Sequence, residues 1–195
     1  MYLALRKYID QYTGTAISDD DFELIKKAFI PKKIRRKQYL LQEGEVCKYL
    51  SFITRGAMRQ YTVDDKGIEH VVRFGIENWW MADRESFELA VPTIYYIDAW
   101  EETELLQINS TNLRYLKNTV PTMKALTQEM EKRSYIAAQK RIHSAISLTA
   151  EERYLDLLKQ NPVFFQRFPQ NMIASYLGIS PETLSRIRKN YLHSN

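Results

Sequence analysis

A carboxylate and a guanidinium stand one helical turn apart near the end of the chain, at Glu182 and Arg186. A guanidinium can donate two hydrogen bonds to O6 and N7 of guanine, and a carboxylate can accept one from N4 of cytosine. The same pair could instead form an i,i+4 ion pair on a solvated helix, which contributes about 0.3 to 0.5 kcal/mol. The elements that carry the two side chains decide between these interpretations.

Residues 170–189 match a helix-turn-helix template at the positions that need a small, apolar or glycine residue. Gly178 stands where a left-handed turn residue is required, and Ala174 is small where the two helices would cross. Ser180 is a good N-cap for the second helix, and Pro181 suits its first turn. The spacing therefore predicts two short helices joined by a tight turn.

The second of these helices is expected to turn Leu184 and Ile187 inward, which leaves Glu182 and Arg186 on its outer surface. A recognition helix presents such residues to the major groove, so the template favours base reading by Glu182 and Arg186 over the ion pair. Four further side chains are expected to contact DNA phosphates: Gln170, Ser180, Thr183 and Lys189.

Composition excludes several classes of protein. The 195 residues are 45% hydrophobic, and the single cysteine, Cys47, rules out an internal disulfide or a cysteine-built metal cluster. The three histidines lie far apart, and no segment is long and apolar enough for a membrane span or a secretory signal. No nucleophile has a neighbouring base and no phosphate-binding glycine loop is present. We expect a cytoplasmic protein that is not an enzyme, with no cofactor and no membrane partner.

The net charge of +4 is compatible with a nucleic-acid partner but too small to establish one. The position of the positive charge along the chain is more informative than its total. Within residues 166–195 four arginine or lysine side chains stand against one glutamate, so most of the positive excess lies in the C-terminal segment.

The pattern of apolar residues changes twice along the chain. Residues 1–30 show helical spacing, with Ser18 opening a second helix that Pro31 ends. From residue 33 to about 108, short apolar or alternating runs are separated by glycine turns, which is typical of an antiparallel sandwich or roll. Pro121 begins a long helix that extends to about Ile146.

Beyond the long helix, Thr149 opens another helix with a T-x-x-E capping box. The pairs Asn161-Pro162 and Phe168-Pro169 bracket what the sequence indicates to be a loop or a short extended piece.

The long helix carries a thin stripe of side chains at three- or four-residue steps, which could form a dimer seam or face the core of its own domain. Small residues in its second half would let two helices approach closely, which favours the dimer. The stripe consists of Val120, Met123, Leu126, Met130, Ser134, Ala137 and Arg141.

This order of elements, together with the motif at 179–189, resembles the Crp-Fnr family of bacterial transcription regulators. The resemblance covers nearly the whole chain, and Gly44 with the strand at 49–56 looks like that family's β-roll. Ser180, Glu182, Thr183 and Arg186 match the family residues that contact phosphate and bases, whereas Pro181 departs from a frequent basic residue.

The resemblance implies an α+β fold in three parts. N-terminal helices and an antiparallel, jelly-roll-like β-roll form a cyclic-nucleotide-binding-like domain in residues 1–118, and 119–147 form the long connecting and dimerisation helix. Residues 148–195 form the helix-turn-helix domain, in which the family's usual wing is not evident. The implied function is that of a homodimeric, sequence-specific transcription regulator, whose partners are a pseudo-palindromic double-stranded DNA operator and RNA polymerase.

Family members that bind cyclic nucleotides use an arginine to neutralise the cyclic phosphate and a carboxylate to hold the ribose. Here Thr93 or Ile94 stands where that arginine belongs, so cyclic AMP is not expected to bind well and the effector is unknown. The candidate effector pocket consists of Trp79, Trp80, Asp83, Arg84, Glu85, Thr93 and Tyr95. Its aromatic residues could equally belong to the core.

Two rival functions remain. A cupin-like metal enzyme could use the same roll, but only His70 lies in the strand region, where several ligands would be needed. Alternatively, the protein could sense a small molecule and act through protein partners, with the helix-turn-helix serving only as a packing unit.

Overall fold

A computed structural model describes the backbone of residues 1–194 and the side chains of residues 1–191. Helices α1 (Tyr2–Thr13) and α2 (Asp19–Ala28) come first, and α3 (Arg84–Leu89) lies among the strands. The strands are β1 (Ile30–Ile34), β2 (Tyr39–Leu41), β3 (Tyr49–Arg55), β4 (Met58–Val63), β5 (Glu69–Gly75), β6 (Trp80–Met81), β7 (Tyr96–Ala99) and β8 (Thr103–Asn109). The later helices are α4 (Ser110–Thr119), α5 (Pro121–Ser147), α6 (Ala150–Gln160), α7 (Pro162–Arg167), α8 (Gln170–Leu177) and α9 (Pro181–Ser194).

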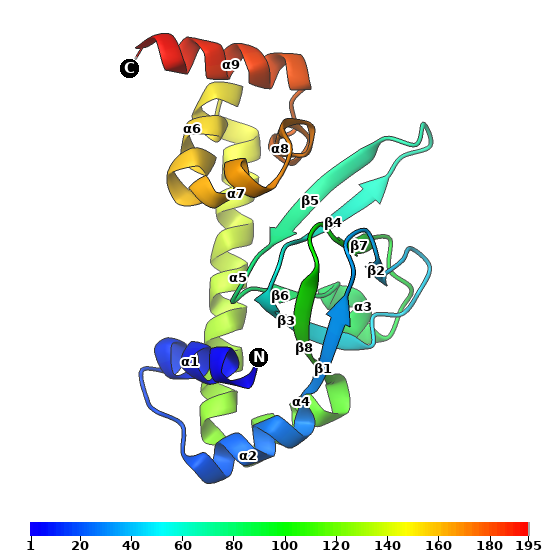
Figure 1. Cartoon of the computed structure of the whole chain (residues 1–195), viewed down its shortest axis with the longest axis vertical. Helices are drawn as coiled ribbons and strands as arrows, with labels where there is room; N and C mark the ends of the chain where they lie inside the picture. The colour runs from blue at the N-terminus through cyan, green and yellow to red at the C-terminus, as the bar shows by residue number, and fades with distance from the viewer. Residues whose placement is uncertain (195) are drawn as a thin grey trace.

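Figure 1 shows α5 running along the molecule, with α2 near one end and α9 at the other. The strands form two four-stranded antiparallel sheets, in the orders β1-β8-β3-β6 and β2-β7-β4-β5. All strands from β2 to β8 begin within residues 33–108, where the sequence predicted an antiparallel sandwich or roll. The α+β fold class and the antiparallel roll are therefore confirmed.

The N-terminal helices begin and end as their sequences indicate. The Ser18 hydroxyl accepts a hydrogen bond from the Asp21 amide at 3.1 Å and caps α2. The helix ends at Ala28, and Pro31 lies within β1 rather than in a loop. Because β1 is at the edge of its sheet, a residue without an amide proton is tolerated there.

Helix α5 begins at Pro121 and extends to Ser147, in agreement with the predicted bounds. Its first turns are buried against the roll and the N-terminal helices through Met123 and Leu126. Its second half leaves apolar side chains exposed, among them Tyr135 at 67%, Ile142 at 53% and Ile146 at 80%. These residues are offset along the helix from the predicted stripe. The last member of that stripe, Arg141, donates hydrogen bonds to the carbonyls of Val72 and Tyr176 of the same chain.

The segment after α5 contains one correct and one wrong prediction. Thr149 forms the expected capping box with Glu152. Residues 161–169, however, are not a loop or an extended piece, because Pro162–Arg167 forms the short helix α7. Pro162 stands at its first position, where a missing amide proton costs nothing and the fixed backbone angle favours helix.

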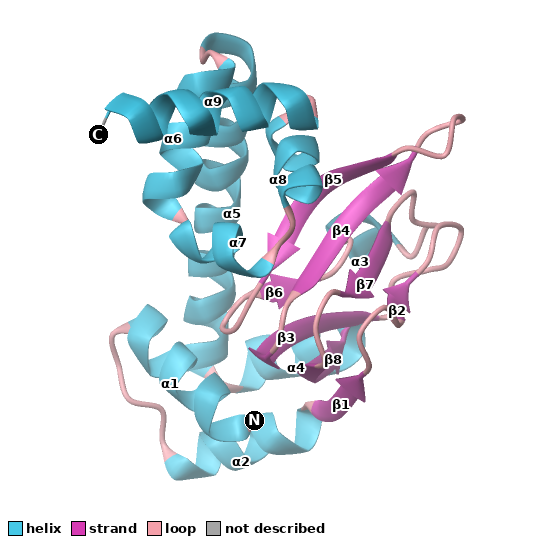
Figure 2. Ribbon diagram, turned by 45° about the horizontal axis from the view of Figure 1, so that its top comes forward, coloured by secondary structure: helices cyan, strands magenta, loops and turns pink. Residues whose placement is uncertain are grey.

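Two groups of buried residues hold the molecule together. The first lies between the roll, α1, α2 and the start of α5. The second combines the C-terminal helices with Ala57, Tyr61, Val71 and Phe74 from β4, β5 and the turn before β4, so the C-terminal helices and the roll share a core. Figure 2 shows α8 next to β5 at this junction. Within residues 1–194 no helix is both long and apolar enough to cross a bilayer.

Candidate nucleic-acid interface

Helices α8 and α9 meet at the tight turn that the sequence predicted. Gly178 adopts the left-handed conformation, with φ 68° and ψ 37°, which a residue without a Cβ reaches at no steric cost. The Ile179 amide then donates to the Ala174 carbonyl at 3.0 Å and closes the end of α8. This geometry sets the direction in which α9 leaves the turn.

The first turn of α9 is capped by Ser180. Its hydroxyl oxygen accepts a hydrogen bond from the Thr183 amide at 3.2 Å and donates to the Thr183 hydroxyl at 3.2 Å. A hydrogen bond from its own backbone amide lowers the pKa of the Glu182 carboxyl below its usual range. The carboxylate is therefore ionised at neutral pH, as an acceptor for a base amine must be.

The two faces of α9 differ as expected. Leu184 and Ile187 are buried in the shared core. The opposite side of the helix forms a shallow hollow of about 520 Å³, lined by Pro181, Glu182, Ser185, Arg186 and Lys189. Glu182 and Arg186 form no ion pair within the described part of the chain, although they are four residues apart. Both side chains are exposed and available to an external partner.

The predicted phosphate-contacting residues are divided between α9 and the start of α8. Lys189 lines the hollow, Gln170 is exposed at the start of α8, and Ser180 and Thr183 are at the cap of α9. Because Ser180 donates to Thr183, the proton of the Thr183 hydroxyl is free to point away from the cap. The arrangement can offer a guanidinium, a carboxylate, an ammonium and hydroxyls to one ligand surface.

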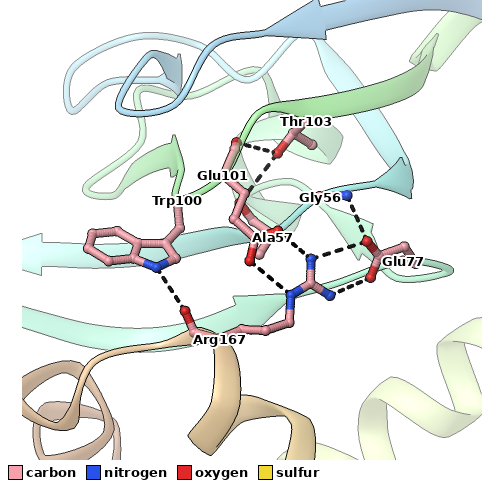
Figure 3. Close-up of polar contacts among 7 residues, drawn as sticks. All are labelled: Gly56, Ala57, Glu77, Trp100, Glu101, Thr103 and Arg167. Atoms are coloured by element: carbon pink, nitrogen blue, oxygen red, sulfur yellow. Dashed lines mark hydrogen bonds and ion pairs between the residues drawn. The ribbon is translucent and has the colours of Figure 1, made fainter.

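An ion-pair cluster attaches this domain to the roll, as Figure 3 shows. Arg167, at the end of α7, donates to Glu77 at 2.5 and 3.1 Å and to Glu101 at 2.6 and 2.9 Å. Its carbonyl accepts a hydrogen bond from the Trp100 indole at 2.9 Å. Burial alone would raise the pKa of Glu77, but hydrogen bonds from Arg167 and from backbone amides lower it, and the bonds to Glu101 and Glu77 raise the pKa of Arg167.

Gly56 supports the cluster through backbone geometry. Its amide donates to Glu77 at 2.7 Å, and its φ of 97° lies in the region that favours glycine. A Cβ at this position would stand 2.5 Å from the Glu102 carbonyl oxygen. The close approach of the two turns that position Glu77 and Glu101 therefore requires a glycine.

Aromatic and edge-strand contacts complete the junction. The Phe74 ring on β5 stacks on Phe168 with centroids 4.0 Å apart and meets Phe164 edge-on at 5.2 Å. The Ser175 hydroxyl on α8 accepts from the Val71 amide at 2.9 Å and donates to the Glu69 carbonyl at 3.0 Å. Together with the ion pairs, these contacts determine where α9 is held relative to the sheet.

The candidate effector residues have different packing partners within the molecule. Trp80 packs in the first core against Phe52 and Phe29, whereas Trp79 meets Phe164 of α7 edge-on at 5.7 Å. Asp83 is buried and caps α3 through the Glu85 amide at 3.1 Å.

The remaining pocket residues are divided between helix and loop. Arg84 begins α3, and Glu85 next to it is exposed. Thr93 is buried, and its hydroxyl accepts from the Tyr95 amide at 3.1 Å. The two tryptophans thus have packing partners, and the effector pocket as a whole stays a prediction.

No cluster of three or more metal-ligating side chains occurs in the part of the chain that the structure describes. Sequence reasoning missed Arg167, Glu77, Glu101 and Ser175 as residues that hold the C-terminal helices against the roll. They are 66 to 106 positions from their partners, so periodicity and local motifs carry no signal for them.

The fold and the helical hairpin define a class of protein in which a β-roll is joined through a long helix to a helix-turn-helix domain. Residues 31–119 match the model of the cyclic nucleotide-binding domain. No curated protein matches the chain in sequence. The chain has the fold of the Crp/Fnr transcription regulators, which confirms the resemblance inferred from the sequence.

Three solved structures illustrate this likeness. FixK2 from Bradyrhizobium japonicum superposes with a TM-score of 0.71 at 18% identity, over 85% of each chain. A mutant of CooA from Carboxydothermus hydrogenoformans gives 0.70 at 16% identity, over 87% of this chain and 79% of that one. A Crp/Fnr-family transcriptional regulator from Eubacterium rectale gives 0.65 at 16% identity, over 91% and 85%.

Proposed function

We propose that this protein is a homodimeric transcription regulator that binds a pseudo-palindromic DNA operator through α9. The supporting observation is the division of α9 into a buried face, Leu184 and Ile187, and an exposed polar face that carries Glu182 and Arg186 without an ion pair between them. In the major groove, Arg186 donates two hydrogen bonds to a guanine and Glu182 accepts one from a neighbouring cytosine.

Phosphate contacts supply the position and most of the salt-dependent affinity. Lys189 and Gln170 are exposed on either side of the turn, and the Thr183 hydroxyl can donate while Ser180 maintains the cap. Contacts of this kind hold the helix in register but do not distinguish one base pair from another.

Two copies of the chain are required to read a two-fold symmetric site. The exposed apolar residues Tyr135, Ile142 and Ile146 on the second half of α5 suit pairing with the same helix of a second copy. Dimerisation along α5 would bring two copies of α9 to one face of a duplex, with half-sites about one helical turn, or roughly 34 Å, apart.

The regulator is proposed to act in the cytoplasm with RNA polymerase as a partner, and without catalytic activity. Its effector is proposed not to be cyclic AMP. Thr93, in the place of the phosphate-binding arginine, is buried and brings no positive charge, and its amide and carbonyl are hydrogen-bonded to Glu45 and Gly44 at 2.8 Å. A cyclic phosphate there would lose water without gaining a counterion.

Selection of bound duplexes from a random pool tests the proposal. Enrichment of a two-fold symmetric motif would establish DNA binding, symmetry and half-site together. A folded, dimeric sample that enriches no sequence would refute the proposal and favour a sensor that acts through protein partners. Titration with cyclic AMP, monitored by calorimetry, tests the effector separately, and tight stoichiometric binding would contradict that part.

A further inference from the structure

Arg73 on β5 faces the interior of the roll. The next residue, Phe74, belongs to the second core and stacks on the C-terminal helices, and successive residues of a strand face opposite sides. The pairing of β5 with β4 is regular from Arg73 to Gly75, so these two residues share a face. A Cβ at Gly75 would stand 2.8 Å from Ile53 Cδ1 and 3.3 Å from Met81 Cε, both in the first core. The side chain of Arg73 therefore enters the roll on the same side as these residues.

A second arginine without a counterion lies near Arg73. Arg84 begins α3, and both arginines are half-buried. Neither guanidinium forms an ion pair or a hydrogen bond among residues 1–191. The neighbouring carboxylate of Asp83 is used as the cap of α3, where it accepts from the Glu85 amide. No described carboxylate therefore neutralises the two cations.

The surroundings of Arg73 disfavour its charge. Burial lowers the pKa of Arg73 below its usual range, the phenol of Tyr176 opposes this shift, and the nearby charge of Arg84 adds to it. Gln60 is buried opposite Arg73 on β4, and its side-chain amide forms no hydrogen bond within the described part of the chain. Two guanidiniums and an amide thus offer donors without acceptors on one side of the sheet.

Like charges that are partly removed from water cost free energy unless an opposite charge accompanies them. An anion between the two arginines would offset both their repulsion and their lost hydration. A guanidinium donates two parallel hydrogen bonds to a carboxylate or a phosphate, so this pair of side chains suits either group.

We propose that Arg73 and Arg84, together with Gln60, form an anion-binding site inside the roll that takes a small carboxylate or phosphate compound. The cations come from β5 and the start of α3, and not from the position of Thr93, which carries no charge. The inference deepens the proposed function, on which it rests for the role of the ligand, by naming the chemical class of the effector.

The anion site adjoins a contact that joins β5 to α5 and α8. The carbonyl of Val72, next to Arg73, accepts a hydrogen bond from Arg141 of α5 at 2.6 Å. Arg141 also donates to the Tyr176 carbonyl at 3.3 Å, and its guanidinium lies 4.1 Å from the centroid of the Tyr176 ring. A ligand held by Arg73 is therefore one residue away from the point where the sheet, the long helix and the helix-turn-helix domain meet.

Melting temperatures in sodium phosphate, sodium succinate and sodium chloride at equal ionic strength test the site without DNA. The variants Arg73→Gln and Arg84→Gln each remove one of the proposed cations, and Arg73→Lys keeps the charge but not the planar fork. The control is Arg114→Gln on α4, which removes an exposed arginine that forms no ion pair in the described part of the chain.

At ten times the Kd of the better anion, wild-type protein should melt roughly 3 to 6 °C higher than in chloride. Arg73→Gln and Arg84→Gln should lose most of this shift, Arg73→Lys should keep part of it, and Arg114→Gln should keep all of it. In chloride alone, Arg73→Gln should melt no lower than wild type, because it removes a half-buried cation that lacks a counterion. The anion that gives the larger shift identifies the ligand group as phosphate or carboxylate.

Equal melting temperatures of the wild type in all three salts would overturn the inference. A shift that both glutamine variants retain would also overturn it, since the anion would then bind elsewhere on the basic protein.

Binding to the selected operator tests the role of the ligand. The saturating anion should change the affinity of the wild type for the operator at least about fivefold and leave that of Arg73→Gln unchanged. Operator binding that the anion does not change would overturn the effector role and still uphold the proposed function. A wild type that binds no operator would refute the proposed function and the effector role, while the melting shifts would still support the anion site.

Discussion

Replacing Arg167 with alanine should loosen the attachment of the helix-turn-helix domain to the roll. Its guanidinium makes four hydrogen bonds to two carboxylates, at 2.5 to 3.1 Å. The substitution leaves Glu77 and Glu101 close together without the cation between them, whereas the Trp100 bond to the Arg167 backbone can persist.

The expected loss in the free energy of unfolding depends on how exposed the three side chains are. The exposed fraction is 20% for Arg167, 37% for Glu77 and 38% for Glu101. Exposed ion pairs contribute at most about 1 kcal/mol, and breaking a fully buried pair costs about 3 to 5 kcal/mol. The cluster lies between these limits. Arg167→Ala is expected to lower the free energy of unfolding by about 2 to 3 kcal/mol, since two carboxylates also lose their counterion.

Denaturant unfolding measures this loss, and double-mutant cycles with Glu77→Gln and Glu101→Gln should each return a coupling energy of about 1 kcal/mol. Glu23→Gln is the matched control, because it removes an exposed i,i+3 pair with Lys26 on α2 and should cost less than about 0.5 kcal/mol. Arg167→Lys should restore only part of the loss, since an ammonium cannot form two parallel hydrogen bonds with each carboxylate.

The contribution of Glu77 to the free energy of unfolding should decrease at acidic pH. Because folding lowers the pKa of Glu77, its ionised form stabilises the protein above the ordinary pKa of 4.5, and this contribution is lost as pH falls below that value. The difference in stability between wild type and Glu77→Gln should therefore shrink on acidification. Coupling energies near zero at pH 7, or a loss for Arg167→Ala no larger than that of the control, would refute the reasoning.

Three further outcomes are expected. In binding titrations, Arg186→Ala should cost about 1 to 3 kcal/mol on the selected operator and relax one base position, whereas Lys189→Ala should weaken specific and random duplexes alike. In sedimentation, Ile142→Asp should shift the protein toward monomer, because it places a charge in the proposed α5 seam, while Lys140→Asp should not. Gly56→Ala should lower the free energy of unfolding by about 2 kcal/mol or more, because its Cβ would collide with the Glu102 carbonyl.

Local signals predicted the helical hairpin well. The left-handed turn at Gly178 and the N-cap at Ser180 depend on residues within a few positions of each other, so a single stretch of sequence contains all the information they need. The same holds for the capping box at Thr149. The base-reading roles of Glu182 and Arg186 stay predictions, since they depend on a partner that only a binding experiment supplies.

Short helices and long-range contacts were beyond prediction from sequence. The pair Asn161-Pro162 indicates a break, although proline is as well suited to the first turn of a helix, and only the packing of Phe164 in the shared core decides the matter. The exposed apolar residues on α5 are offset from the predicted stripe, and Arg141, its last member, contacts carbonyls on β5 and α8 that no local pattern reveals.

Strand β5 is the outer strand of its sheet, and the Ser175 hydroxyl of α8 occupies its free amide at Val71 and its free carbonyl at Glu69. A swing of the C-terminal helices away from the roll would leave these groups open, and an open outer strand is a template for pairing with another chain. Any motion of the C-terminal helices away from the roll must therefore be small or brief, or must provide β5 with a substitute neighbour, if the protein is to avoid self-association.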